Sequence, residues 1–91
     1  MPLDLRDLRC FVAVYELRGF ARAAKALTTV QSSVSTRVRR LEHFIGAPLF
    51  NRTHRNITPT EKGVQLYQYA RKVLDHVGEL EVAVKREKPA A

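Results

Sequence analysis

Hydrophobic residues recur along the first half of the chain with the three-and-four spacing of helices that bury one face. The first such stretch predicts a helix over residues 5–17. We expect it to start at Asp4 or Pro2 and to stop at Gly19. Asp7 suits the positive end of the helix dipole. The positions that form its apolar face are Leu5, Leu8, Phe11, Val12 and Tyr15.

Two further helices follow. A short one is predicted over 20–27, where small residues allow close packing and where Thr28 and Thr29 break the pattern. Its inner face is formed by Phe20, Ala23, Ala24 and Leu27. The next is predicted over 30–45 and ends at Gly46, because Pro48 prevents its continuation. Its inner stripe consists of Val34, Val38, Leu41 and Ile45. Its opposite face carries Ser32, Ser35, Thr36, Arg39 and His43.

After these helices the pattern predicts a short hairpin and one long helix. The strands are expected at 49–52 and 55–58, around a turn at Thr53–His54. The long helix is predicted to run to about residue 86. Thr58 is expected as its N-cap, followed by Pro59 at the first position and Glu61 at the third, a capping box. A seam with heptad-like spacing follows, at Gly63, Leu66, Ala70, Val73, Val77, Leu80 and Val84, with Tyr67 and Leu74 beside it.

These elements predict a mainly α fold. The first part, 1–58, is expected to be a winged helix-turn-helix domain, a three-helix core with a short β-hairpin wing. Within it the helix-turn-helix spans about 20–40 and the wing about 48–58. The long helix is expected over 59–88, and residues 89–91 are expected to begin a linker.

The charge changes the picture, because it is concentrated in one place. The chain carries a net charge of +7. Between residues 18 and 55 there are eight basic side chains and one acid, Glu42, so this stretch accounts for the whole excess. A localised basic patch is typical of a protein that binds a polyanion, although a solubilising surface is the simpler alternative.

The helix over 30–45 has the chemistry of a helix that enters the major groove of DNA. Short polar side chains that can bond base edges come first, and cations for the flanking phosphates come later. Its amino end also offers free N–H groups to a phosphate. The alternative is an ordinary amphipathic surface helix with a basic face.

Other chemistries find little support. His43, His54, His76 and Cys10 lack zinc-ligand spacing, so no metal site is expected. The chain has no glycine-rich phosphate loop and no arrangement of nucleophile and base, so we expect no enzyme. One cysteine allows no intrachain disulfide and suits a reducing compartment, so Cys10 is predicted to be a packing residue. The amino terminus resembles neither a secretory signal nor a membrane span.

The chain resembles the amino-terminal part of LysR-type transcriptional regulators over about residues 3–65. The matching segments, in order, are LRCFVAVY (8–15), GFARAAKAL (19–27), VQSSVSTRVRRLE (30–42), GAPLFNR (46–52) and TPTEKG (58–63). Four positions depart from the family pattern: Gly19 and Val30 replace serine, Ser32 replaces a frequent proline, and Thr36 replaces a frequent arginine. Because Val30 has no hydroxyl, either Thr29 caps the third helix or that end is uncapped. The departures bear on base preference and not on the fold.

The resemblance implies sequence-specific binding of double-stranded DNA for bacterial transcription regulation. The residues expected to face base edges are Gln31, Ser32, Ser35 and Thr36. Those expected at phosphates or a groove edge are Arg22, Lys25, Ser33, Arg37, Arg39, Arg40, Arg52 and Arg55, of which Arg52 and Arg55 lie on the wing, against the backbone or in the minor groove. Each single arginine has the alternative of a solvated side chain or an ion pair with Glu42.

The resemblance also implies partners. The long helix is expected to form a homodimer through Leu66, Tyr67, Ala70, Val73, Leu74, Val77, Leu80 and Val84. Full-length relatives carry an effector-sensing domain after this helix, so we expect none in this chain and no cofactor. For the full-length protein a small-molecule inducer and a tetramer are expected. RNA polymerase is a further candidate partner, and the expected location is the cytoplasm. An architectural DNA binder without sequence preference, or a module that binds an acidic protein, are the competing hypotheses.

Overall fold

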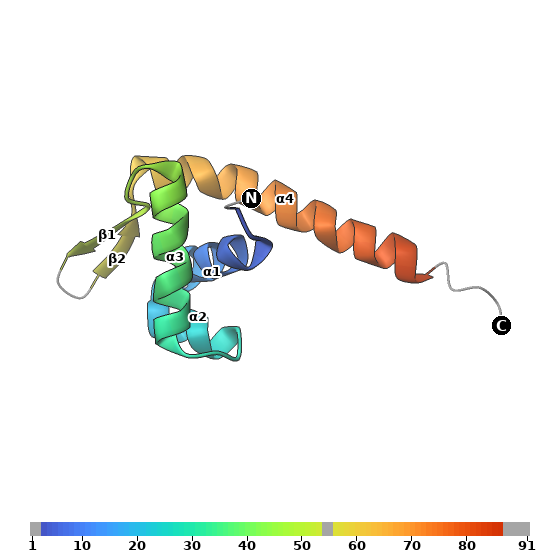
Figure 1. Cartoon of the computed structure of the whole chain (residues 1–91), viewed down its shortest axis with the longest axis horizontal. Coiled ribbons are helices and arrows are strands. Elements are labelled where there is room, and N and C mark those ends of the chain that lie inside the picture. The colour runs from blue at the N-terminus through green and yellow to red at the C-terminus, as the bar shows by residue number, and fades with distance from the viewer. Residues whose placement is uncertain (1–2, 54–55, 87–91) are drawn as a thin grey trace.

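Four helices and a two-stranded hairpin follow one another in the order that the hydrophobic pattern predicts (Figure 1). This computed structural model describes residues 3–53 and 56–86. The helices are α1 Leu5–Leu17, α2 Phe20–Ala26, α3 Gln31–Ile45 and α4 Glu61–Arg86. The strands are β1 Phe50–Thr53 and β2 Asn56–Pro59. The predicted winged helix-turn-helix followed by a long helix is therefore confirmed as the fold.

The core lies where α1, α2 and α3 meet, and it is closed by the first half of α4 and by the hairpin. The apolar stripes of the helices face one another there, so that Phe11, Val34 and Val38 are fully buried. Phe50 brings the hairpin into this core, because its ring lies 5.5 Å from that of Phe11. Burying such rings stabilises the packing of the wing against the helices.

Helix α1 begins at Asp4, one of the two predicted starts, but it does not end at Gly19 as predicted. The carboxylate of Asp4 accepts a hydrogen bond from the backbone N–H of Arg6 at 2.8 Å, so Asp4 is the N-cap. At the other end Arg18 adopts the left-handed conformation, with a φ of 58°. The prediction that Gly19 stops the helix is wrong in detail. Gly19 is extended and serves as the N-cap of α2.

The start of α4 also differs from the prediction. The pattern placed the cap at Thr58, but Thr58 and Pro59 belong to strand β2, where Pro59 pairs with Phe50. Thr60 is the cap instead. Its hydroxyl accepts a hydrogen bond from the backbone N–H of Gly63 at 3.0 Å and donates one to the carbonyl of Pro48 at 2.7 Å. The helix therefore begins two residues later than expected.

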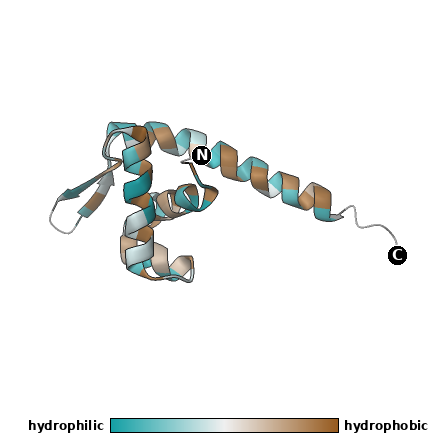
Figure 2. Cartoon of the chain, in the orientation of Figure 1, coloured by the Kyte–Doolittle hydropathy of each residue, from teal (hydrophilic) through white to brown (hydrophobic). Residues whose placement is uncertain are grey.

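Helix α4 leaves the core and continues alone (Figure 1). Its 26 residues span about 39 Å at 1.5 Å per residue. The first half packs on α1, where the rings of Tyr15 and Tyr67 stack 3.9 Å apart and the Tyr67 hydroxyl donates a hydrogen bond to Glu16 at 2.5 Å. Figure 2 shows hydrophobic residues along the second half as well, beyond the other helices.

Candidate nucleic-acid interface

Helix α3 turns its polar side chains outward. Gln31, Ser32 and Thr36 are exposed, whereas the residues of the reverse side are buried in the core. Those buried residues are Val34, Val38 and Leu41. Ser35 is half-buried at the margin of the outward face, so the structure brings together three of the four side chains predicted to meet base edges and leaves the fourth at the edge.

The amino end of α3 has no side-chain cap. Val30 is the N-cap residue, it is 61% exposed, and it makes no side-chain hydrogen bond to the helix. Thr29 does not cap the helix one residue earlier, so of the two alternatives the uncapped end is the one observed. The N–H of Ser33 bonds to the carbonyl of Val30 at 3.1 Å, whereas those of Gln31 and Ser32 have no backbone partner among the described residues. These two N–H groups and the positive end of the helix dipole are therefore available to an anion such as a phosphate.

The basic side chains predicted at phosphates differ in whether they contact other groups of the protein. Lys25, Arg39 and Arg40 are exposed. Arg22 is exposed as well, but its guanidinium donates hydrogen bonds to the carbonyls of Leu17 at 3.1 Å and Arg18 at 3.4 Å. It thus satisfies carbonyl groups at the end of α1, which would otherwise lack partners.

Arg37 does not join the outward basic face. Its guanidinium donates a hydrogen bond to the carboxylate of Asp7 at 3.0 Å and lies 4.0 Å from that of Asp4. The side chain is only 25% exposed. Ser33, its neighbour toward the amino end of the helix, is half-buried. The structure therefore places the positive charge of Arg37 against two acids of α1.

The wing is tied to α3 through Glu42. This carboxylate accepts a hydrogen bond from the backbone N–H of Leu49 at 2.8 Å, and its other oxygen accepts one from Arg52 at 3.4 Å. Arg52 also lies over the ring of Phe20, 5.1 Å from its centre. The ion pair with Glu42 that the sequence left open is thus formed by Arg52, whose side chain remains 43% exposed. Arg55 and His54 lie outside the described residues.

The residues predicted to form a dimer divide between two environments. Four of them pack on the core of their own chain: Leu66, Tyr67, Ala70 and Leu74. Ala70 is fully covered there, at 1% exposure. Val77 is half-buried. The three most exposed are Val73, Leu80 and Val84, at 41%, 61% and 63%.

Asp7 is a buried acid for which the sequence predicts no contact with α3. It occupies an inward position of α1 and is 1% exposed, although it was interpreted only as an acid that suits the helix dipole. A signal was present in the sequence. Asp7 falls within the apolar stripe of α1, and Arg37 lies directly beside the buried stripe of α3, so a charge pair between the two helices could have been inferred.

Among residues 3–53 and 56–86, no group of three or more His, Cys, Asp or Glu lies close enough to hold a metal ion. In the same part of the chain no helix has the length and hydropathy needed to span a bilayer. Cys10 is buried and free, and its burial raises the pKa of its thiol.

Comparison with known proteins connects this geometry to a family. Residues 5–64 match the family model described as bacterial regulatory helix-turn-helix protein, lysR family. The chain belongs to the LysR family. Among its relatives are the HTH-type transcriptional regulators PecT of Dickeya dadantii (strain 3937) and IlvY of Escherichia coli (strain K12). PecT is 53% identical over 81% of the chain, and IlvY is 36% identical over 97%.

Solved structures of LysR-family proteins share the fold over nearly the whole chain. The BenM_DBD/catB site 1 DNA complex has a TM-score of 0.90 at 36% identity, with 98% of this chain and 99% of that chain covered. The CbnR_DBD–DNA complex has a TM-score of 0.86 at 30% identity, with 96% and 100% covered. By contrast, the chain spans only 23% of the length of PecT and 30% of that of IlvY.

Proposed function

We propose that this LysR-family chain binds double-stranded DNA in a sequence-specific manner and so regulates bacterial transcription. The observation that carries the proposal is the outward polar face of α3, anchored from behind by buried Val34, Val38 and Leu41. An α-helix fits the major groove, where each base pair presents a distinct pattern of donors and acceptors. The likeness to BenM_DBD and CbnR_DBD, both named as DNA complexes, supports it.

Each side chain receives a role from its chemistry and exposure. Gln31 suits a bidentate contact with adenine, while Ser32 and Thr36 accept or donate single hydrogen bonds to base edges. Arg39, Arg40 and Lys25 meet phosphates on either side of the groove. Exposed Arg52 brings the wing to the backbone or into the minor groove, and we extend this role to Arg55.

Binding to a selected duplex tests the proposal. The chain is used to enrich a duplex from a randomised library, and its affinity for that duplex and for an unrelated one of equal length is measured at several salt concentrations. We expect a preference of about 10³-fold or more and a steep loss of affinity with salt. Equal affinity for both duplexes would indicate an architectural binder. Affinity without salt dependence would exclude a phosphate-contacting surface.

Two substitutions separate base contacts from phosphate contacts. Thr36→Ala should relax the preference at one base position and leave the salt dependence unchanged. Arg52→Ala should weaken binding to most sequences and flatten the slope of log affinity against log salt by about one unit. If Arg52→Ala changes neither quantity, the wing assignment is incorrect.

The proposal includes a homodimer formed by the second half of α4. Val73, Leu80 and Val84 share one side of this helix and are exposed, and a partner copy would remove them from water. Two-fold symmetry would then present two recognition helices to major grooves about 34 Å apart.

Sedimentation equilibrium of two matched variants tests the dimer. Leu80→Glu places a charge on the proposed seam and should shift the protein toward monomer. Val82→Glu is the control, because Val82 is 55% exposed and lies on the opposite side of the helix. A dimer that withstands Leu80→Glu would exclude this interface.

The full-length context remains part of the proposal. Membership of the LysR family supports an effector domain after α4, a small-molecule inducer, a tetramer and contact with RNA polymerase. A regulator of this kind would act in the cytoplasm, where the bacterial chromosome lies, through binding and without catalysis.

A further inference from the structure

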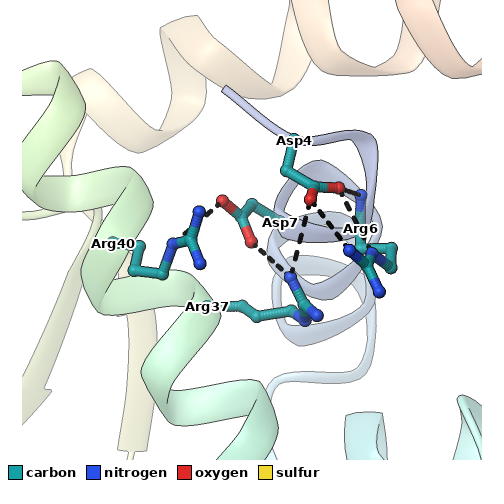
Figure 3. Close-up of polar contacts among 5 residues, drawn as sticks. All are labelled: Asp4, Arg6, Asp7, Arg37 and Arg40. Atoms are coloured by element: carbon teal, nitrogen blue, oxygen red, sulfur yellow. Dashed lines mark hydrogen bonds and ion pairs between the residues drawn. The ribbon is translucent and has the colours of Figure 1, made fainter. Parts of the chain in front are cut away.

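A buried carboxylate of α1 faces two arginines of α3 (Figure 3). Asp7 is 1% exposed, so both of its oxygens are withdrawn from water. Burying a charge is costly unless it is paired, so the groups that face Asp7 must compensate for its lost hydration. Those groups come from the helix that carries the proposed DNA contacts.

The two arginines meet different oxygens of Asp7. Arg37 donates a hydrogen bond to Oδ1 at 3.0 Å, and its side chain is three-quarters buried. Arg40 turns its Nε toward Oδ2 at 3.6 Å, and Oδ2 has no hydrogen-bond partner among the described residues. The Arg40 side chain is 54% exposed, and Nε is its nitrogen nearest to Asp7. Its two terminal nitrogens are therefore left for a ligand in solvent.

We propose that Asp7 is a positioning residue for DNA binding: it holds Arg40 through Nε, so that the terminal nitrogens of Arg40 meet a backbone phosphate in a preset orientation. Arg37 holds the Asp7 carboxylate in place through its hydrogen bond and makes no contact with DNA. The inference rests on the proposed DNA-binding function, and it adds a residue of α1 to the groups that determine affinity.

The physical reason is the entropy of a free arginine. A long side chain that must become immobile when it binds costs part of the binding free energy, and a side chain already held in place avoids that cost. The charge of Asp7 acts in the opposite direction, because a carboxylate near phosphates repels them. Positioning and charge thus predict effects of opposite sign when the carboxylate is removed.

A double-mutant cycle uses this difference in sign. The affinity of the wild-type chain, Asp7→Asn, Arg40→Gln and the double variant is measured for the duplex enriched by the wild-type chain from a randomised library. We expect Asp7→Asn to weaken binding by about three- to ten-fold in the wild-type background. In the Arg40→Gln background it should cause no further weakening, because Asp7 acts through Arg40.

Asp4→Asn is the matched control. It removes the same charge from the same helix turn, and asparagine is an equally good N-cap, so α1 keeps its start. Asp4 lies near Arg37 and Arg6 but has no ion pair with Arg40 among the described residues. We therefore expect Asp4→Asn not to weaken DNA binding.

The outcomes separate the inference from the function on which it rests. If the wild-type chain shows no preference for any duplex, the proposed function fails. If it binds, but Asp7→Asn tightens binding or weakens it equally in both backgrounds, the positioning role is refuted. Should circular dichroism show that Asp7→Asn does not fold, Arg40→Lys decides: it keeps the charge but lacks Nε, and wild-type affinity of that variant would equally refute the role.

Discussion

Replacing Gly63 with alanine should destabilise the protein, although alanine is the better helix former. Gly63 lies in the first turn of α4, directly against the segment that leads into the hairpin. A Cβ at this position would lie 2.2 Å from the carbonyl oxygen of Leu49 and 3.2 Å from its carbonyl carbon. Both atoms belong to the backbone, so no side chain can rotate away and the helix itself must shift.

The magnitude follows from two opposing effects. Alanine gains about 1 kcal/mol over glycine within a helix. Overpacking in a closed site costs about 1–3 kcal/mol, and an overlap of this size with backbone atoms belongs at the upper end of that range. The free energy of unfolding should therefore fall by about 2 kcal/mol, which corresponds to a loss of roughly 8–16 °C in Tm for a domain of this size.

Gly78→Ala provides a matched control in the same helix. A Cβ at Gly78 would meet nothing within 4 Å, so only the helix propensity changes and stability should rise by up to about 1 kcal/mol. Urea unfolding at equal protein concentration, followed by circular dichroism, measures both variants. If Gly63→Ala is as stable as the wild type, the close approach of α4 to Leu49 does not constrain the fold, and the reasoning is refuted.

Three further predictions concern the cap of α4, the joint between α1 and α4, and the buried thiol. Thr60→Val should lower the free energy of unfolding by about 1–2 kcal/mol in urea titrations, because two hydrogen bonds are lost. Thr58→Val should change it by less than about 0.5 kcal/mol. Equal effects of the two substitutions would indicate that Thr58 is the cap. The hydrogen bond to Glu16, together with partial burial, raises the pKa of Tyr67 above its usual value of 10.0, so the stabilisation should be complete below pH 10 and lost as the pH rises above it. Tyr67→Phe should therefore be less stable than the wild type at pH 7, with a difference that narrows in alkaline unfolding experiments; a constant difference would argue against the bond. Burial raises the pKa of the Cys10 thiol. At pH 8, iodoacetamide should therefore alkylate Cys10 far more slowly in the folded protein than in the protein unfolded by urea. Equal rates would show that the thiol is accessible in the folded protein.

The helical part of the fold was predictable because burial dictates periodicity. Val34, Val38 and Leu41 could be assigned to the core from spacing alone, and the structure buries all three. The same spacing placed Thr36 on the outer face. Information of this kind is local, since each helix must hide one side whatever its neighbours are.

The helix boundaries were less predictable, because they depend on contacts between distant parts of the chain. Thr58 and Thr60 both fit a capping pattern. The choice between them follows from strand pairing, since Pro59 must lie opposite Phe50 to complete the hairpin. The hydroxyl of Thr60 is then within hydrogen-bond distance of the carbonyl of Pro48, a contact that the sequence around Thr60 does not predict.

The candidate site shows the same division. The exposed basic side chains of α3 were foreseen, but the diversion of Arg37 depends on Asp7, thirty residues away on another helix. Helical spacing places Arg37 at the border of the buried face, where an arginine can turn either way. Only the arrangement of α1 against α3 decides between the two.

The stacked rings of Tyr15 and Tyr67 join α4 to α1 and lie at the point about which α4 would pivot. From Ala70, the last fully covered residue of α4, to Arg86 the helix extends about 24 Å, so a tilt of about 10° at the pivot displaces its far end by about 4 Å. In an assembly joined through that end, the packing of α4 on α1 would set the separation between the α3 helices of the two copies. A substitution at the tyrosine pair would therefore change that separation without replacing any side chain of α3.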